Sequence, residues 1–224
     1  MLKIDQLVIE NTGSYDEFEA SVAERKIEAP KKKSIKETVP FSNEIYDFSA
    51  INGEVYWEER TLEYVFEITA MSAEKLEEKK QPFVSWIMNI KEAKIYDPFI
   101  ADFHFVGTFD SISFDDSEIE KSTITVKFTA YPYMIANKKR FFKFNLTESA
   151  AVVKNVFNNS SHRITPTFIS DVPVTLEVGG ESYSIPAGET TDDSFKLEPG
   201  VSAITLQSTG GSGSVTIEFC EEVF

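Results

Sequence analysis

Residues 48–68, FSAINGEVYWEERTLEYVFEI, combine a turn, a group of large side chains and a strand. The Asn52-Gly53 dipeptide predicts a tight reversal, because glycine tolerates positive φ. From residue 62 onward an apolar side chain recurs at every second position, which is the period of a strand with one face on a core. The residues between turn and strand offer wide contact surfaces but no nucleophile, metal pair or phosphate loop: Tyr56, Trp57, Glu58, Glu59 and Arg60. The stretch therefore predicts a contact surface mounted on a sheet, not a reaction centre.

The composition indicates a globular protein rich in strands. At 224 residues the chain is long enough for one large β domain or two smaller ones. Phenylalanine occurs 19 times, and aromatic enrichment favours strands. The first residues lack the apolar core of a signal peptide, and no run of about 18 apolar residues suggests a membrane span. We expect a protein made in a cytoplasm.

Acidic residues outnumber basic ones by 37 to 22, which gives a net charge of −15. Such a surface repels polyanions, so sequence-specific binding to nucleic acid and binding to anionic lipid are not expected. One exception is residues 30–36, PKKKSIK, a flexible cationic segment. It is interpreted either as a solvated loop or as an extended arm that docks on an acidic neighbour.

Two domains follow from the patterns along the chain. Residues 72–90 carry the one convincing helical pattern, with Ser72 as a candidate N-cap and Pro82 expected to kink the helix or to begin a second one. Strand patterns on both sides of it predict a β-sandwich or barrel-like first domain over residues 1–135. Short strands separated by Gly and Pro turns predict a second β-sandwich over residues 136–224. The expected fold class is mainly β.

No pattern of catalytic or metal-binding residues emerges. His104 and His162 lack the ligands or nucleophile that a site would need, and both are expected to have ordinary surface roles. The acidic pairs at 115–116 and 192–193 lack the spacing of a calcium loop and are predicted to be solvated turns. A single cysteine, Cys220, excludes an intrachain disulfide and a Cys-rich zinc site. We expect no catalytic residue, no cofactor and no metal.

The succession of segments resembles the distal tail proteins of long-tailed (siphovirus) phages and prophages of Gram-positive bacteria. No single motif is diagnostic, and the resemblance rests on the order of elements along nearly the whole chain. The segments that carry it are residues 48–68, the helix ending in VSWIMNI, the strand end FTAYPYMI, and in the second domain TPTFISDVPVTLEVGGESYSI and FKLEPGVSAITLQSTGGSGSVTIEF.

The resemblance implies a virion structural protein of the tail tip, made in the host cytoplasm. The first domain would assemble into a hexamer ring, and the second would be a galectin-like β-sandwich that projects outward. Such a ring is the baseplate hub that joins the major tail tube protein to the tail-associated lysin or fibre protein, and in many phages to receptor-binding proteins used in host attachment. DNA would pass through the lumen, where acidic side chains would let it slide without sticking.

Tyr56, Trp57 and Arg60 are predicted to lie at contacts between subunits, because these residue types are enriched in the centres of interfaces. The alternative is that Tyr56 and Trp57 cap the core of their own domain. A rival function is a carbohydrate-binding adhesion module that uses the C-terminal sandwich, with Tyr183 as the candidate glycan contact. A third is an enzyme that degrades cell-wall polymer through paired carboxylates.

Overall fold

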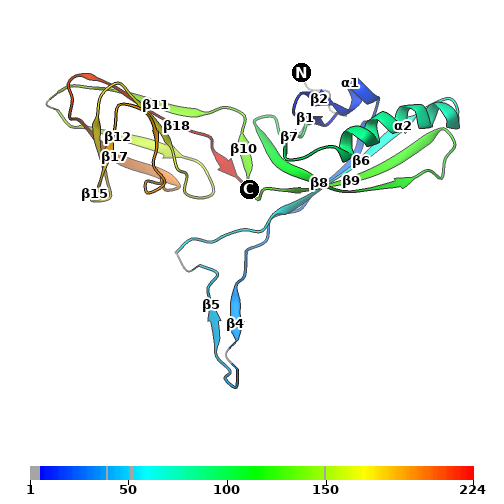
Figure 1. The fold of residues 1–224 in the computed structure, drawn as a ribbon, viewed down its shortest axis with the longest axis horizontal. Coiled ribbons are helices and arrows are strands. Elements are labelled where there is room, and N and C mark those ends of the chain that lie inside the picture. The colour runs from blue at the N-terminus through cyan, green and yellow to red at the C-terminus, as the bar shows by residue number, and fades with distance from the viewer. Residues whose placement is uncertain (1–5, 39, 51–52, 149) are drawn as a thin grey trace. The chain divides into compact units, whose positions relative to one another are not determined.

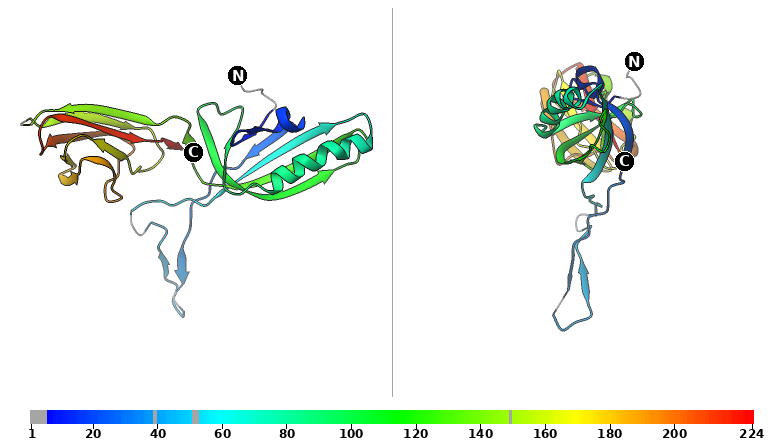
Figure 2. Two further views of the ribbon diagram at one scale, coloured as in Figure 1. Left: turned by 45° about the horizontal axis from the view of Figure 1, so that its top comes forward. Right: turned by 90° about the vertical axis from the view of Figure 1, so that its right-hand side faces the viewer.

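Strands dominate the computed structural model, which describes residues 6–38, 40–50, 53–148 and 150–224 (Figures 1 and 2). Strands make up 53% of the chain and helices 10%, so the mainly β fold class predicted from the sequence is confirmed. The chain divides into two compact units: Met1–Met134 together with Phe224, and Ile135–Val223.

The first unit is built on one antiparallel sheet. Its strands are β1 (Val8–Ile9), β2 (Thr12–Gly13), β3 (Ser21–Ile27), β6 (Arg60–Thr69), β7 (Ala93–Tyr96), β8 (Phe103–Asp115) and β9 (Lys121–Ala130). They lie in the order β2-β1-β7-β8-β9-β6-β3. The helices α1 (Ser14–Phe18) and α2 (Ala73–Met88) cover one face. The sequence predicted a β-sandwich or barrel-like domain with one helix. In the structure, helices cover the face of the sheet on which a sandwich would have its second sheet.

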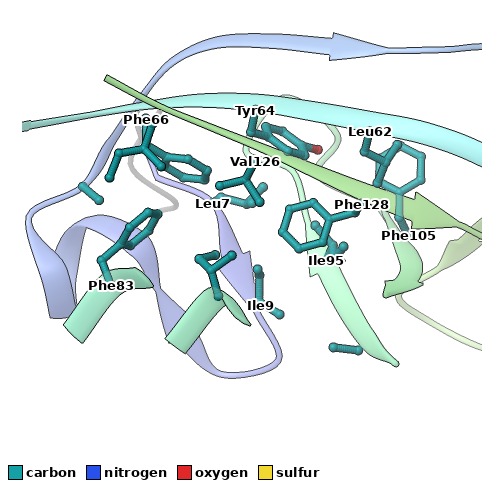
Figure 3. Close-up of a cluster of buried hydrophobic side chains, with 14 of the residues drawn as sticks. Leu7, Ile9, Leu62, Tyr64, Phe66, Phe83, Ile95, Phe105, Val126 and Phe128 are labelled. Carbon is teal, nitrogen blue, oxygen red and sulfur yellow. The ribbon is translucent and has the colours of Figure 1, made fainter. Parts of the chain in front are cut away.

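The core of the first unit follows from the alternation along β6. This strand pairs with β9 over its full length, from Arg60↔Ala130 to Thr69↔Lys121. Every second side chain of both strands is buried on the face of the sheet that carries the helices, and Phe83 of α2 lies 5.0 Å from Phe66, centroid to centroid (Figure 3). The buried side chains of the two strands and the helix are Leu62, Tyr64, Phe66, Ile68, Ile124, Val126, Phe128, Leu76, Phe83 and Ile87. Each large apolar side chain buried in this way stabilises the fold by about 1.5–3 kcal/mol.

Helix α2 begins and ends near the predicted positions. The Ser72 side chain accepts a hydrogen bond from the Lys75 amide at 3.4 Å, as expected for an N-cap. The helix continues through Pro82, so no second helix begins there. Pro82 is exposed, and its missing N–H removes one hydrogen bond from the outer side of the helix.

A buried carboxylate links three parts of the first unit. Asp97 is fully buried, and it accepts hydrogen bonds from the Tyr64 hydroxyl at 3.0 Å and the Phe99 amide at 2.8 Å. The Tyr64 hydroxyl bonds to Oδ2, whereas the Arg25 guanidinium lies 2.7 Å from Oδ1, the oxygen that accepts from the Phe99 amide. A buried charge needs such partners, because its desolvation is costly. Asp97 therefore ties the edge strand β3 to the central strand β6 and to the turn after β7.

Replacing Tyr64 with Phe is expected to lower the free energy of unfolding by about 1–3 kcal/mol at pH 7, because Asp97 keeps its burial but loses a donor. Burial, followed by the Asp97 charge, raises the pKa of Tyr64 well above its usual 10.0. The stabilisation from the neutral hydroxyl is therefore complete below pH 10.0, and it is lost as the pH rises toward the folded-state pKa. Urea titrations of both proteins across this range should show the difference in stability shrinking above pH 10.0. A difference that does not change with pH contradicts this account.

The second unit is a β-sandwich, as predicted. Its strands are β11 (Arg140–Leu146), β12 (Val152–Asn158), β13 (Thr167–Ser170), β14 (Val174–Val178), β15 (Glu181–Ile185), β16 (Gly188–Thr191), β17 (Gly200–Ser208) and β18 (Gly213–Phe219). One sheet has the order β11-β18-β13-β16 and the other β12-β17-β14-β15. Their inner faces bury Phe168, Leu176, Ile204 and Ile217 in one core. Two short strands precede and follow these eight strands in the chain: β10 (Met134–Ala136) comes before β11, and β19 (Glu222–Val223) comes after β18.

Candidate assembly surface

Between β3 and β6 the chain leaves the sheet of the first unit and forms an arm, residues 28–59. The arm contains a hairpin in which β4 (Lys36–Thr38) pairs with β5 (Ile45–Asp47). Every described residue from 31 to 48 is exposed to solvent. In each view the hairpin stands clear of the sheet and helices of its own unit (Figures 1 and 2). The PKKKSIK segment lies in this arm and is exposed from Lys31 to Lys36, and its docking on an acidic neighbour remains a prediction.

The arm displays an unusual amount of apolar surface. Single exposed apolar residues are ordinary, but a concentration of them marks a binding surface. Tyr46 and Phe48 stack with their centroids 6.3 Å apart and both face solvent. The exposed large apolar side chains of the described arm are Ile35, Phe41, Ile45, Tyr46, Phe48, Val55 and Tyr56. Within the described chain no core covers these side chains, so they form an apolar surface that is open to solvent.

The tip of the arm is strained. Phe41 has φ 64, a left-handed conformation that is rare for a bulky residue, and its ring is fully exposed. Such strain costs on the order of 1–3 kcal/mol and is found most often at functional sites. The backbone of the tip therefore holds an apolar ring outward in a conformation that its own chain does not favour.

The root of the arm is held by backbone pairing and by one aromatic cluster. The Lys33 amide donates to the Tyr56 carbonyl at 2.8 Å, and the Glu58 amide donates to the Lys31 carbonyl at 2.8 Å. The Trp57 ring packs against Phe224 with centroids 4.6 Å apart. Tyr133 also stacks on Phe224, with centroids 5.0 Å apart. The Gly53 amide donates to the Ala50 carbonyl with φ 76 at Gly53, whereas Asn52 of the predicted turn lies outside the described residues.

Arg60 lies under the arm root and is only 6% exposed. Its Nε donates to the Glu28 carbonyl at 2.9 Å, and its guanidinium carbon lies 5.6 Å from the centre of the Phe105 ring. Burial lowers the pKa of the guanidinium. Arg60 thus joins the two chain segments from which the arm leaves the sheet.

The three predicted interface residues therefore have different surroundings. Tyr56 is exposed on the arm, Trp57 is half-buried against Phe224, and Arg60 is buried inside its own unit. The contacts of Trp57 are those of the alternative in which it caps its own domain, and the interface role of all three residues remains a prediction. Sequence reasoning missed the apolar side chains at 41–48. The signal was available, because FSNEIYDF places large apolar residues in a polar segment with no strand of the core nearby.

The predicted surface residues also differ in their surroundings. Tyr183 is half-buried with its ring edge-on to Phe195 at 5.1 Å, and its role as a glycan contact remains a prediction. The expectation that His104 is a surface residue is wrong, because it is buried and packs 5.3 Å from the Tyr96 ring. The Nε2 of His162 lies 3.3 Å from the Glu222 carboxylate.

One predicted acidic turn anchors a helix. Asp116 lies 2.8 Å from the nearly buried Lys80 amino group of α2 and accepts a hydrogen bond from Ser122. The Lys80 hydrogen bond, followed by that of Ser122, lowers the pKa of Asp116. Across the described ranges, no group of three or more His, Cys, Asp or Glu residues is placed to hold a metal ion. Among the described helices, none combines the length and apolar character needed to cross a membrane.

Comparison with solved structures identifies the fold. The Dit protein (gp 19.1) of phage SPP1, described as a paradigm of the hub adsorption apparatus in phages that infect Gram-positive bacteria, superimposes with a TM-score of 0.70. The match covers 97% of this chain and 100% of that one at 14% identity. The chain has the Dit fold. The resemblance to distal tail proteins expected from the sequence is thus confirmed for the fold.

Other comparisons add little to the Dit fold. A chain from the structure of the phage P2 baseplate in its activated conformation with Ca also matches. The match covers 96% of this chain and 97% of the baseplate chain at 10% identity, but its TM-score of 0.40 is too low to carry an argument. No family model and no curated protein matches the sequence.

Replacing Arg60 with Ala is expected to lower the free energy of unfolding by about 1–3 kcal/mol, because the Glu28 carbonyl at the arm root loses a charged donor. Urea unfolding of the purified protein measures this change. Glu59→Ala is the matched control, since Glu59 is exposed beside it and should change stability by less than about 0.5 kcal/mol. If Arg60→Ala instead leaves stability unchanged and weakens self-association, the interface role predicted from the sequence is correct.

Proposed function

We propose that this protein is a structural hub of a phage or prophage tail and that six copies assemble into a ring. The ring joins the major tail tube protein to the tail-associated lysin or fibre protein, and it provides a platform for receptor-binding proteins. The observation that carries the proposal is the Dit fold, which extends over 97% of this chain and the whole of the SPP1 protein. A partial match could reflect one common domain, whereas this one includes both units in the same order.

The arm supports the assembly part of the proposal. It carries seven exposed large apolar side chains within the described residues, and its root is fixed by Arg60 and the Trp57–Phe224 contact. An exposed apolar surface on a fixed root is suited to binding another protein surface, because burial of apolar area drives association. The arm is therefore assigned to contacts between subunits.

The uncovered face of the sheet supports passage of DNA through the ring. This face of β6 and β9 carries threonines and charges in pairs, with Glu63 3.1 Å from Lys127 and Glu67 2.8 Å from Lys121. A lysine already paired with a carboxylate attracts phosphate weakly, so this face would hold DNA loosely. In the proposed ring it lines the lumen, and no sequence-specific contact with nucleic acid is needed.

The hub role needs no catalysis, cofactor or membrane contact. It places the protein at the tail tip of the virion after synthesis in the host cytoplasm. The rival adhesion module depends on a single aromatic candidate, Tyr183, which is half-buried with its ring edge-on to Phe195. The third candidate, a cell-wall hydrolase, would use the carboxylates of the acidic cluster at 115–116. In the structure, Asp116 of this cluster forms an ion pair with Lys80.

The test is the mass of the purified full chain by light scattering over a range of concentrations, with negative-stain electron microscopy of the same samples. The expected result is a six-membered ring with an open centre, alone or after addition of the tail tube and lysin proteins of the same phage. If the protein stays monomeric and does not bind the tail tube and lysin proteins, the proposed hub function is wrong. Glycan binding by the full chain that is lost in Tyr183→Ala moves the assignment to the adhesion module.

Replacing residues 36–48 with a short Gly-Ser linker is expected to abolish self-association, because it removes the apolar hairpin and leaves the root intact. The variant should keep the circular dichroism spectrum and the urea midpoint of the parent, since the hairpin lies outside both cores. Light scattering and urea unfolding provide the two readouts. Undiminished assembly of this variant shows that the arm is not the subunit contact.

A further inference from the structure

The hairpin at the end of the arm combines negative charge with exposed apolar side chains. Residues 36–48 contain three carboxylates, Glu37, Glu44 and Asp47, against one lysine. The same residues expose Phe41, the stacked pair formed by Tyr46 and Phe48, and Ile45. A surface that covers this hairpin should therefore be apolar at its centre and basic at its rim.

Two grooves formed by described residues of the first unit are large enough to receive an aromatic side chain. The Trp86 groove lies beside the end of α2, has a volume of about 720 Å³, and includes Ile9, Glu10, Trp86, Lys91 and Glu92 in its lining. The Met71 groove lies where β6 ends and α2 begins. It has a volume of about 580 Å³ and is lined by Thr69, Ala70, Met71, Lys75 and Lys79.

Charge distinguishes these grooves. The lining of the Trp86 groove contains two glutamates and one lysine, and it would repel an acidic hairpin. The lining of the Met71 groove contains two lysines and no carboxylate, with Met71 96% exposed between them. Lys75 and Lys79 are paired with Glu78 and Glu19 outside the lining, but these are partly exposed ion pairs that exchange at little cost. The Met71 groove thus matches the hairpin in both apolar character and charge.

The position of this groove has a geometric consequence. The arm joins β6 at its first residue, Arg60, and the groove begins at its last, Thr69. A ten-residue strand separates them by about 30 Å. A contact between the arm of one copy and the groove of another therefore joins two different surfaces, and head-to-tail contacts of this kind generate closed rings when the rotation closes.

We propose that the arm hairpin binds the Met71 groove of a second copy of this chain, with the Phe41 ring as its anchor. The inference rests on the proposed ring and identifies the surface that receives the arm. Burial of the ring against Met71 and Ala70 offsets the strain of the left-handed backbone at Phe41. Glu44 and Asp47 then lie near Lys75 and Lys79.

Cross-linking tests this pairing in the full chain, with Cys220→Ser as the background. Asn43→Cys at the tip is combined with Ala73→Cys beside the Met71 groove, or with Lys91→Cys in the Trp86 groove, and each protein is treated with a short bis-maleimide. The expected result is a ladder of covalent multimers for the first pair and none for the second. All three positions are exposed, so both pairs are equally open to the reagent.

The outcomes separate this inference from the ring itself. If only the Lys91→Cys pair gives a ladder, or if rings form without any ladder, the proposed contact with the Met71 groove is wrong and the proposed ring stands. If the chain stays monomeric and gives no ladder with either pair, the proposed contact is wrong, and the result also counts against the proposed ring.

Self-association constants provide a second readout. Phe41→Ala should weaken association by about 30-fold, as for an aromatic anchor, and Phe141→Ala, which removes an exposed ring from the second unit, should leave it unchanged. Glu44→Lys and Lys75→Glu should each weaken association roughly two- to fivefold, and the double variant should recover most of the loss. Absence of recovery, or equal effects of Phe41→Ala and Phe141→Ala, contradicts the proposed contact.

Discussion

The burial of alternate side chains of β6 on the face of the sheet that carries the helices is the constraint on which the first unit depends. Tyr64 and Phe66 contribute to the core from the middle of the strand, and Tyr64 also donates to the buried Asp97. Because the period of a strand is two, this burial fixes the register with β9 and the faces of all neighbouring strands. It also determines that the arm leaves at one end of β6 and that the Met71 groove opens at the other.

The parts of the fold that depend on local pattern could be predicted from the sequence. The alternation in residues 62–68 and the helical spacing after Ser72 report burial directly, so β6 and α2 were expected close to their observed positions. The order of segments also indicated the distal tail protein fold. The arm was only partly predicted: an extended arm was one interpretation of residues 30–36, but the apolar side chains at 41–48 have no period that assigns them to a core and were missed.

The candidate surface shows the same limit at single residues. Arg60 was expected at an interface because of its residue type, yet its guanidinium bonds to a carbonyl 32 positions earlier in the chain. His104 occupies a polar position in its strand, but the Tyr96 ring covers it from β7. Both outcomes depend on contacts between distant segments, and a single sequence contains no signal for those contacts.

The aromatic cluster at the arm root has a consequence for biosynthesis. Trp57 and Tyr133 pack on Phe224, which is separated from Trp57 by most of the chain. A contact of such long range forms late, because the intervening chain must first be made and ordered. On the ribosome, the root is therefore completed only after the strands of both units have been translated, and until then its backbone pairing and Arg60 hold the arm without the aromatic cluster.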